Sequence, residues 1–153
     1  MNESQVAFNP YDINDNAELS RVIKLNMPSF FDPDELEDYL KFLNSQRQFY
    51  FTVHDENKKV VGGFGYSLFS SEGFAKIDWI FFDPKIHGCG IGSKAVRFCE
   101  SHILPHKTVK KIVITTSQKT SAFFKKLGYR LEKTQDDFWG KGLHLHQVVK
   151  SIG

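Results

Sequence analysis

Three alternate glycines are the feature of this sequence that points most directly to chemistry. Gly88, Gly90 and Gly92 lie between two apolar segments. The first segment ends at Phe82, and the second runs to Ile103 with helical spacing. Glycine lets backbone N–H groups approach a ligand without obstruction by a Cβ atom, and amides at a helix start favour an anion. The pattern therefore predicts a site for a phosphate or pyrophosphate group.

Two common phosphate motifs do not fit these glycines. A Walker loop ends in Gly-Lys-Ser/Thr, whereas the order here is Gly92-Ser93-Lys94. A dinucleotide fingerprint requires a third glycine at position 93, which is serine, and an early strand of a βαβ unit. The strand predicted here follows a hairpin instead, so a nucleotide-binding domain of either kind is disfavoured.

One carboxylate interrupts the apolar segment that precedes the glycines. Asp78 lies between Ile77 and Trp79. Burial would raise its pKa, as a general base requires. Because side chains alternate along a strand, we expect Asp78, Ile80 and Phe82 on one face. Asp78 is thus a candidate base, and a structural aspartate that is hydrogen-bonded or at a strand edge is the alternative.

The predicted elements place the glycines between a buried strand and a helix. Strands are predicted at 5–8, 49–53, 60–68, 75–82, 111–116, 129–132 and 143–149, and helices at 17–26, 32–43, 92–103 and 117–127. The order β-α-α-β-β-β-α-β-α-β-β indicates an α/β fold with a mixed, mostly antiparallel sheet of six or seven strands, flanked by helices. Gly62, Gly63 and Gly65 indicate a bulge or a close backbone approach in the third strand. The length suits one domain over residues 1–153.

Charge and composition disfavour several classes of partner. The net charge of +2 is too small to indicate nucleic-acid binding. There is no apolar run of ~18 residues and no leader pattern, so we expect no membrane association. Cys89 and Cys99 form no metal-ligand spacing with the histidines, which predicts no metal and fits reduced thiols in a cytoplasmic protein. A monomer and a homodimer are both compatible with the sequence.

Two motifs in matching order make the chain resemble the GNAT family of N-acetyltransferases. This family places Arg/Gln-x-x-Gly-x-Gly/Ala between its fourth strand and third helix, often after a hydrophobic-x-Pro step. Residues 87–92 read His-Gly-Cys-Gly-Ile-Gly, and residues 82–84 read Phe-Asp-Pro. A second family signature, a helix ending in Tyr-x-x-x-Gly-Phe, reads Phe-Lys-Lys-Leu-Gly-Tyr at 124–129. The expected strand order also matches, so the resemblance covers nearly the whole chain.

The resemblance implies acetyl-CoA as the cofactor. Amides of the glycine loop would hold the CoA pyrophosphate, and the preceding strand would pair with the pantetheine arm through its backbone. The implied CoA-binding residues are Ile80, Phe81, Phe82, His87, Gly88, Cys89, Gly90, Ile91, Gly92, Ser93, Ser117 and Phe124.

Three of these residues depart from the family pattern. His87 replaces arginine or glutamine, Ser117 replaces a common asparagine, and Phe124 replaces a tyrosine that protonates the departing thiolate in many members. A phenyl ring donates no proton, so another group or water would serve as the acid. The Phe124 departure also keeps a non-catalytic CoA-binding module open as an alternative.

The resemblance further implies an enzyme that transfers an acetyl group to a primary amine of a small molecule, by direct attack in a ternary complex. Phe30 and Phe31 lie in the link between the first two helices, which borders the acceptor in this family. His144, on the last predicted strand, is the third candidate for contact with the substrate. Core packing for the phenylalanines, an exposed strand face for His144, and a peptide or protein acceptor are the alternatives. Direct transfer leaves little role for Cys89 as a nucleophile.

Overall fold

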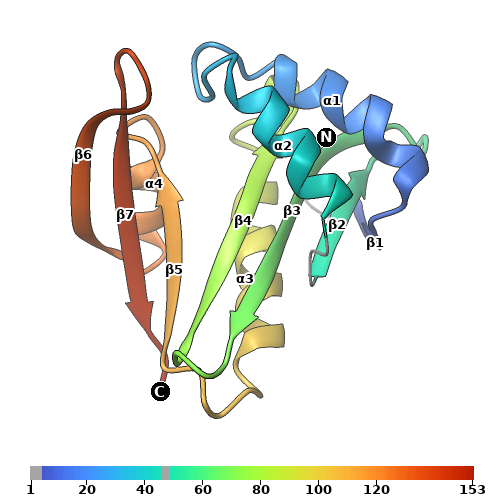
Figure 1. The fold of residues 1–153 in the computed structure, drawn as a ribbon. Helices are drawn as coiled ribbons and strands as arrows, with labels where there is room; N and C mark the ends of the chain where they lie inside the picture. The colour runs from blue at the N-terminus through green and yellow to red at the C-terminus, as the bar shows by residue number, and fades with distance from the viewer. Residues whose placement is uncertain (1–4, 46–48) are drawn as a thin grey trace.

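The computed structural model describes residues 5–45 and 49–153, which form a seven-stranded sheet with helices on both faces (Figure 1). The strands are β1 Ala7–Pro10, β2 Phe49–His54, β3 Val60–Phe69, β4 Phe74–Phe82, β5 Lys111–Thr116, β6 Arg130–Gly140 and β7 Leu143–Ser151. The helices are α1 Asn16–Lys24, α2 Glu35–Asn44, α3 Ile91–Ile103 and α4 Ser121–Lys126. The sheet order is β1-β2-β3-β4-β5-β7-β6, with β4 and β5 parallel and the other neighbours antiparallel. The predicted fold class and element order are confirmed.

Several boundaries differ from the sequence prediction. The sequence predicts a turn at residues 139–142 between the last two strands, but β6 extends to Gly140, so Trp139 lies in a strand. Most of this strand is exposed and polar, and its length follows from pairing with β7, which local patterns do not report. Helix α4 begins only at Ser121, because Ser117 Oγ accepts the Lys119 N–H at 3.1 Å and stabilises a turn before the helix.

Two apolar clusters pack on opposite faces of the sheet. One joins α3 and α4 to the strands and includes Ala95, Phe124 and, from β4, Ala75 and Ile77. The other joins α1 and α2 to the sheet; its members include Leu19, Ile23, Tyr39, Leu43, Tyr50 and Phe81. In Figure 1, α3 accordingly lies behind β3 and β4, while α1 and α2 cover the other face. Side chains of β4 are therefore buried under α3 and α4 on one face of the sheet and under α1 and α2 on the other.

A bulge in β4 reverses the alternation of its side chains. Gly63 pairs with Phe81 and Gly65 pairs with Asp78, so β4 contains one extra residue in this interval. Trp79 there has φ +44°, and its ring packs with the α1–α2 cluster together with Phe81. This bulge lies in the fourth strand, whereas the sequence indicated a bulge or a close backbone approach in the third. The close approach is present in β3, because a Cβ on Gly65 would lie 2.2 Å from the Phe49 carbonyl oxygen.

The bulge also corrects the face expected for Asp78. Ile80 packs with the α3 cluster and Phe82 belongs to it, whereas Asp78 pairs with Gly65 and binds Ser67 on the α1–α2 face. Asp78, Ile80 and Phe82 therefore do not share one face. The reason is the period of two in a strand, which one inserted residue shifts to the opposite face.

β4 and β5 separate soon after they begin. Residues 74–76 of β4 pair with residues 111–113 of β5, and no pairing continues beyond Lys76 in the described strands. Figure 1 shows the two strands close together near the C-terminus and diverging toward the loop that precedes α3. The divergence leaves the second half of β4 with one strand neighbour, β3.

The hydroxyl of Tyr50 holds the bulge in place. It donates to the Trp79 carbonyl at 2.8 Å and lies 3.0 Å from the Tyr39 hydroxyl. Tyr50→Phe should therefore lower the free energy of unfolding by about 1–3 kcal/mol, because buried polar groups lose a partner. Tyr66→Phe is the matched control, since the Tyr66 hydroxyl makes no hydrogen bond within the described residues. Urea denaturation measures both, and equal losses in the two variants would contradict this role.

Candidate functional site

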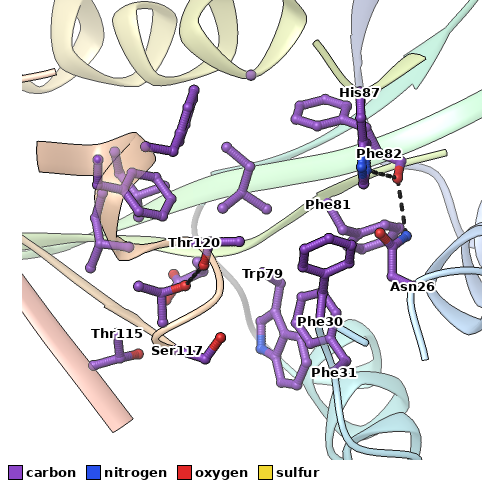
Figure 2. A pocket seen from close by; sticks show the side chains of 18 of the residues that line it. Asn26, Phe30, Phe31, Trp79, Phe81, Phe82, His87, Thr115, Ser117 and Thr120 are labelled. Atoms are coloured by element: carbon purple, nitrogen blue, oxygen red, sulfur yellow. Dashed lines mark hydrogen bonds between the residues drawn. The ribbon is translucent and has the colours of Figure 1, made fainter. Parts of the chain in front are cut away.

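A cavity of about 610 Å³ occupies the opening between β4 and β5 (Figure 2). Its lining comes from segments far apart in the sequence: the α1–α2 link, β4, the loop before α3, the end of β5, α4 and the tip of β6. The lining residues are Asn26, Phe30, Phe31, Glu35, Lys76, Ile77, Asp78, Trp79, Ile80, Phe81, Phe82, Ile86, His87, Gly88, Gly90, Gly92, Ser93, Ile114, Thr115, Thr116, Ser117, Thr120, Phe123, Phe124 and Trp139.

The glycine loop forms an open cradle at one end of this cavity. Gly88 and Gly90 have φ angles of +82° and +83°, which residues other than glycine adopt only with strain. A Cβ on Gly88 would meet nothing within 4 Å, so the backbone there is accessible. Gly90 is the N-cap of α3, and the 13 residues of that helix give its first-turn amides the electrostatics of an anion site. These residues fit a pyrophosphate group.

Helix α4 closes the side of the cavity next to α3. Gly92 permits this packing, because a Cβ there would lie 3.1 Å from the Phe123 ring. Phe124 is buried and packs edge-on against Phe123 and Tyr129. Ser117 is also buried, at the point where β5 turns toward α4. Phe124 and Ser117 thus line the cavity while they stabilise its wall.

The carbonyl of Phe82 is held by two side chains from different segments. Asn26, at the end of α1, donates through Nδ2 at 3.0 Å, and Nε2 of His87 lies 3.0 Å from the same oxygen (Figure 2). A carbonyl oxygen accepts only, so this nitrogen of His87 carries the proton. The Phe30 ring packs edge-on against the His87 ring. Side chains from the α1–α2 link and from the glycine loop therefore meet at the carbonyl of Phe82, the last residue of β4.

Aromatic rings line the part of the cavity beneath the α1–α2 link. Phe31 stacks with Trp79 at 6.1 Å and meets Phe81 edge-on. The Trp139 indole, at the tip of β6, donates to the Thr116 carbonyl at 2.9 Å. The hairpin tip also touches the link, because a Cβ on Gly140 would lie 2.2 Å from Oδ1 of Asp32. The link and the hairpin therefore meet across the opening.

Two carboxylates with raised pKa values line this cavity. Burial raises the pKa of Asp78, while the Ser67 hydroxyl, which donates to its Oδ2 at 2.6 Å, and Lys76 lower it. Burial raises the pKa of Glu35 further, from 4.5 to about 7. Glu35 lies at the start of α2, 6% exposed. The cavity thus contains two acidic groups whose pKa values burial raises, Glu35 to about 7.

Most of the residues predicted from the sequence meet at this cavity. Its lining includes Asp78, Phe30, Phe31, Ile80, Phe81, Phe82, His87, Gly88, Gly90, Gly92, Ser93, Ser117 and Phe124. Cys89 and Ile91 belong to the loop and helix start but not to the lining, and Ile91 is buried. His144 also lies outside the lining; its Nδ1 accepts the Asp137 N–H at 3.0 Å on the β6–β7 hairpin. The ligand contacts of all these residues stay predictions.

The lining residues that the sequence analysis did not single out include Asn26, Glu35 and Trp139. Glu35 follows Asp32 and Pro33 at a helix start, a place where acidic residues are common and usually exposed. Trp139 was assigned to a turn. The sequence signal for Glu35 was an acidic residue close to a chain reversal, and that for Trp139 was a tryptophan in such a place. Neither signal by itself indicates a site.

Within residues 5–45 and 49–153, no helix has the length and apolar character needed to cross a membrane. The same ranges contain no group of three or more His, Cys, Asp or Glu side chains arranged to hold a metal ion.

Comparison with known proteins agrees with this geometry. A model of the acetyltransferase (GNAT) family matches residues 19–129. A spermidine N-acetyltransferase from Vibrio cholerae, solved with CoA and spermine, has a TM-score of 0.74 at 17% identity, with 97% of this chain and 96% of that chain covered. An aminoglycoside 6′-N-acetyltransferase complexed with coenzyme A has a TM-score of 0.70 at 14% identity, with 96% of this chain and 97% of that chain covered. A ribosomal-protein-S5-alanine acetyltransferase from Vibrio fischeri has a TM-score of 0.71 at 16% identity, with 97% of this chain and 93% of that chain covered. A search of the curated proteins finds no match.

The cradle can be tested by one methyl group. Gly90→Ala should weaken CoA binding about tenfold or more, because the displaced amides would lose a hydrogen bond to a charged group worth ~1.5–3 kcal/mol. Gly73→Ala is the matched control, since Gly73 has a similar φ of +81° in the β3–β4 turn, away from the cavity. Each change should cost roughly 1–2 kcal/mol of stability. Calorimetric titration with CoA measures the difference, and equal affinities would remove the loop from the CoA site.

Proposed function

Because the chain belongs to the GNAT family of acetyltransferases, we propose that it transfers an acetyl group from acetyl-CoA to the primary amine of a small molecule with an apolar or aromatic body. Enzymes of this family use acetyl-CoA as the acetyl donor. The observation that carries the proposal is a continuous cavity that runs from the glycine cradle, between β4 and β5, to the aromatic chamber under the α1–α2 link.

The cradle and the free edge of β4 support the CoA end of this proposal. Bound acetyl-CoA supplies the activated acetyl thioester that the reaction requires. The amides at the start of α3 would hold the pyrophosphate, and the unpaired edge of β4 after Lys76 would align the pantetheine arm by main-chain hydrogen bonds. Residues 80–82 and 87–93, with Ser117 and Phe124 across the cavity, are the proposed binding residues.

The backbone of Phe82 is the proposed donor to the thioester carbonyl oxygen. The Asp83 N–H donates to the Val61 carbonyl at 2.8 Å, on the β3 side. Successive N–H groups of a strand point to opposite edges, so the Phe82 N–H is directed toward the opening. Asn26 and His87 hold this residue through its carbonyl. A donor fixed in this way stabilises developing negative charge without reorganisation, and orientation of the reactants adds to the rate.

The shape of the acceptor end favours a small amine over a peptide. Phe30, Phe31, Trp79 and Trp139 supply aromatic surface, and the contact between Asp32 and Gly140 limits the length of a groove. Aromatic faces attract a cation as well as an apolar body. The three structural neighbours act, by their names, on a polyamine, an aminoglycoside and a ribosomal protein, so the fold alone does not choose among acceptors.

A panel assay tests the function directly. Release of thiol from acetyl-CoA would be followed with arylalkyl and alkyl monoamines, polyamines, amino acids and peptides. We expect turnover with monoamines that have an aromatic or aliphatic body, and weaker turnover with peptides. Peptide turnover above that of every small amine would favour a peptide acetyltransferase. Tight CoA binding without thiol release in any reaction would indicate a CoA-binding module.

By the family resemblance, Phe124 corresponds to the tyrosine that is the usual proton donor. Phe124→Tyr should keep or raise the kcat of thiol release, because the added hydroxyl can protonate the departing thiolate. Phe124→Ala should instead lower the free energy of unfolding by about 3–5 kcal/mol, since the ring is buried. Stopped-assay kinetics and thermal denaturation of the two variants separate these effects. A large fall of kcat in a stable Phe124→Tyr protein would contradict the placement of residue 124 beside the CoA sulfur.

A further inference from the structure

We propose that Glu35 is the general base of the reaction and receives the proton that the acceptor ammonium must lose before attack. This inference rests on the proposed function and adds a catalytic residue to it. Glu35 comes from α2, outside the glycine loop, β4 and the other segments to which the sequence analysis assigned chemistry.

The position of Glu35 places it at the cavity while most of its side chain is shielded from solvent. It is buried at the start of α2, yet it lines the cavity together with Phe30, Phe31 and Trp79. Its Oε2 accepts the Asp32 N–H at 2.8 Å, which fixes the carboxylate relative to the α1–α2 link. Oε1 makes no hydrogen bond within the described residues. Because no fully buried side-chain oxygen there lacks a partner, Oε1 retains some exposed surface, and Glu35 is a lining residue of the cavity.

The charges around Glu35 favour its protonated form more than usual. Burial is the main cause of the raised pKa of about 7, and the carboxylates of Asp32 and Asp38 add to it, while the Asp32 N–H opposes it. From the other elements of the cavity, Lys76, Asp78 and His87 face the same space. A base with a pKa close to the operating pH combines a substantial ionised fraction with proton affinity, which is the condition for efficient proton transfer.

Asp78 is less suited to this step than the sequence indicated. Ser67 donates to one of its oxygens at 2.6 Å, and Lys76 favours its ionised form. A carboxylate held in this way stabilises a nearby cation but has less tendency to take its proton. Glu35 is therefore the better candidate for the base, and Asp78 is a buried aspartate that Ser67 holds by a hydrogen bond.

The proton balance of the transfer is complete with Glu35 alone as base. Glu35 takes one proton from the ammonium, and the lone pair that this exposes forms the bond between nitrogen and the acetyl carbon. The carbon–sulfur bond breaks and sulfur leaves with its electron pair. The second proton lost by nitrogen ends on that sulfur, through water or a neighbouring hydroxyl, and Glu35 returns its own proton to solvent. The products are the amide, the thiol and one proton.

The first test is the pH profile of Glu35→Gln, which keeps an oxygen for the Asp32 N–H and removes the titration. In the wild type, kcat/KM should rise as pH increases through about 7, because the base must be ionised. Glu35→Gln should lack this rise and lose roughly 10²–10⁴-fold in kcat/KM, with CoA affinity unchanged. Above the pKa of the free amine the wild-type profile should level off or fall, because the ammonium is the form that Glu35 deprotonates. Glu35→Gln depends on the free amine and should rise there instead, so the two limbs can be told apart.

Two further variants make this result specific. Glu37→Gln is the matched control, because Glu37 lies on the same helix with its side chain 77% exposed, in an ion pair with Lys41. It should retain the wild-type profile. Glu35→Asp keeps a carboxylate with shorter reach, so it should keep the rise near neutral pH at a lower rate. If Asp78→Asn abolishes that rise while Glu35→Gln retains it, Asp78 is the base and the inference is overturned.

The second test needs no turnover. The pKa of Glu35 is raised on folding, so its stabilising contribution is complete below pH 4.5 and is lost as pH rises to about 7. The Tm of Glu35→Gln should therefore increase relative to that of the wild type across this range, because the amide carries no charge at any pH. A constant difference for Glu35→Gln would contradict the inference. Turnover in the wild type with full activity in Glu35→Gln overturns Glu35 alone, whereas no wild-type turnover with any amine overturns the proposed function and Glu35 with it.

Discussion

The separation of β4 from β5 is the constraint on which the rest of this structure depends. Parallel neighbours normally share hydrogen bonds along their whole length, but here the pairing ends at Lys76 and Val113. Backbone groups beyond that point face a cavity, and such groups require partners. The edge of β4 is therefore prepared for a ligand that carries its own amides. The glycine cradle lies at the end of the same edge, so in the proposed binding mode one strand would direct both the arm and the phosphates of a CoA molecule.

The bulge at Trp79 keeps the two faces of β4 suited to different tasks. Beyond the bulge, Phe81 packs with α1 and α2, while Ile80 and Phe82 pack with α3. Tyr50 and Tyr39 hold the bulge through buried hydroxyls, and burial raises the pKa of both far above its ordinary value. They remain neutral donors at any physiological pH and serve as structural groups. The titratable groups on the acceptor side are instead carboxylates.

The acceptor chamber is assembled from two segments that the sheet holds apart. The α1–α2 link brings Phe30, Phe31 and Glu35, and the β6–β7 hairpin brings Trp139 and Gly140. Their contact at Asp32 encloses the aromatic surface, and the same residue fixes the Glu35 carboxylate through its N–H. The start of α2 thus both closes this part of the cavity and fixes the buried carboxylate of Glu35.

The sequence by itself determined the parts of this protein that depend on local patterns. The glycine loop, the helix that follows it, the apolar β4 and the order of elements all follow from residue spacing along one stretch of chain. Only the tertiary structure decided the face of Asp78, the burial of Glu35, the length of β6 and the place of His144 outside the cavity. Each of these depends on pairing or packing between segments distant in sequence. A single inserted residue in β4 exchanges the faces of the sheet, and an acidic residue at a helix start becomes a buried acid only when another part of the fold covers it.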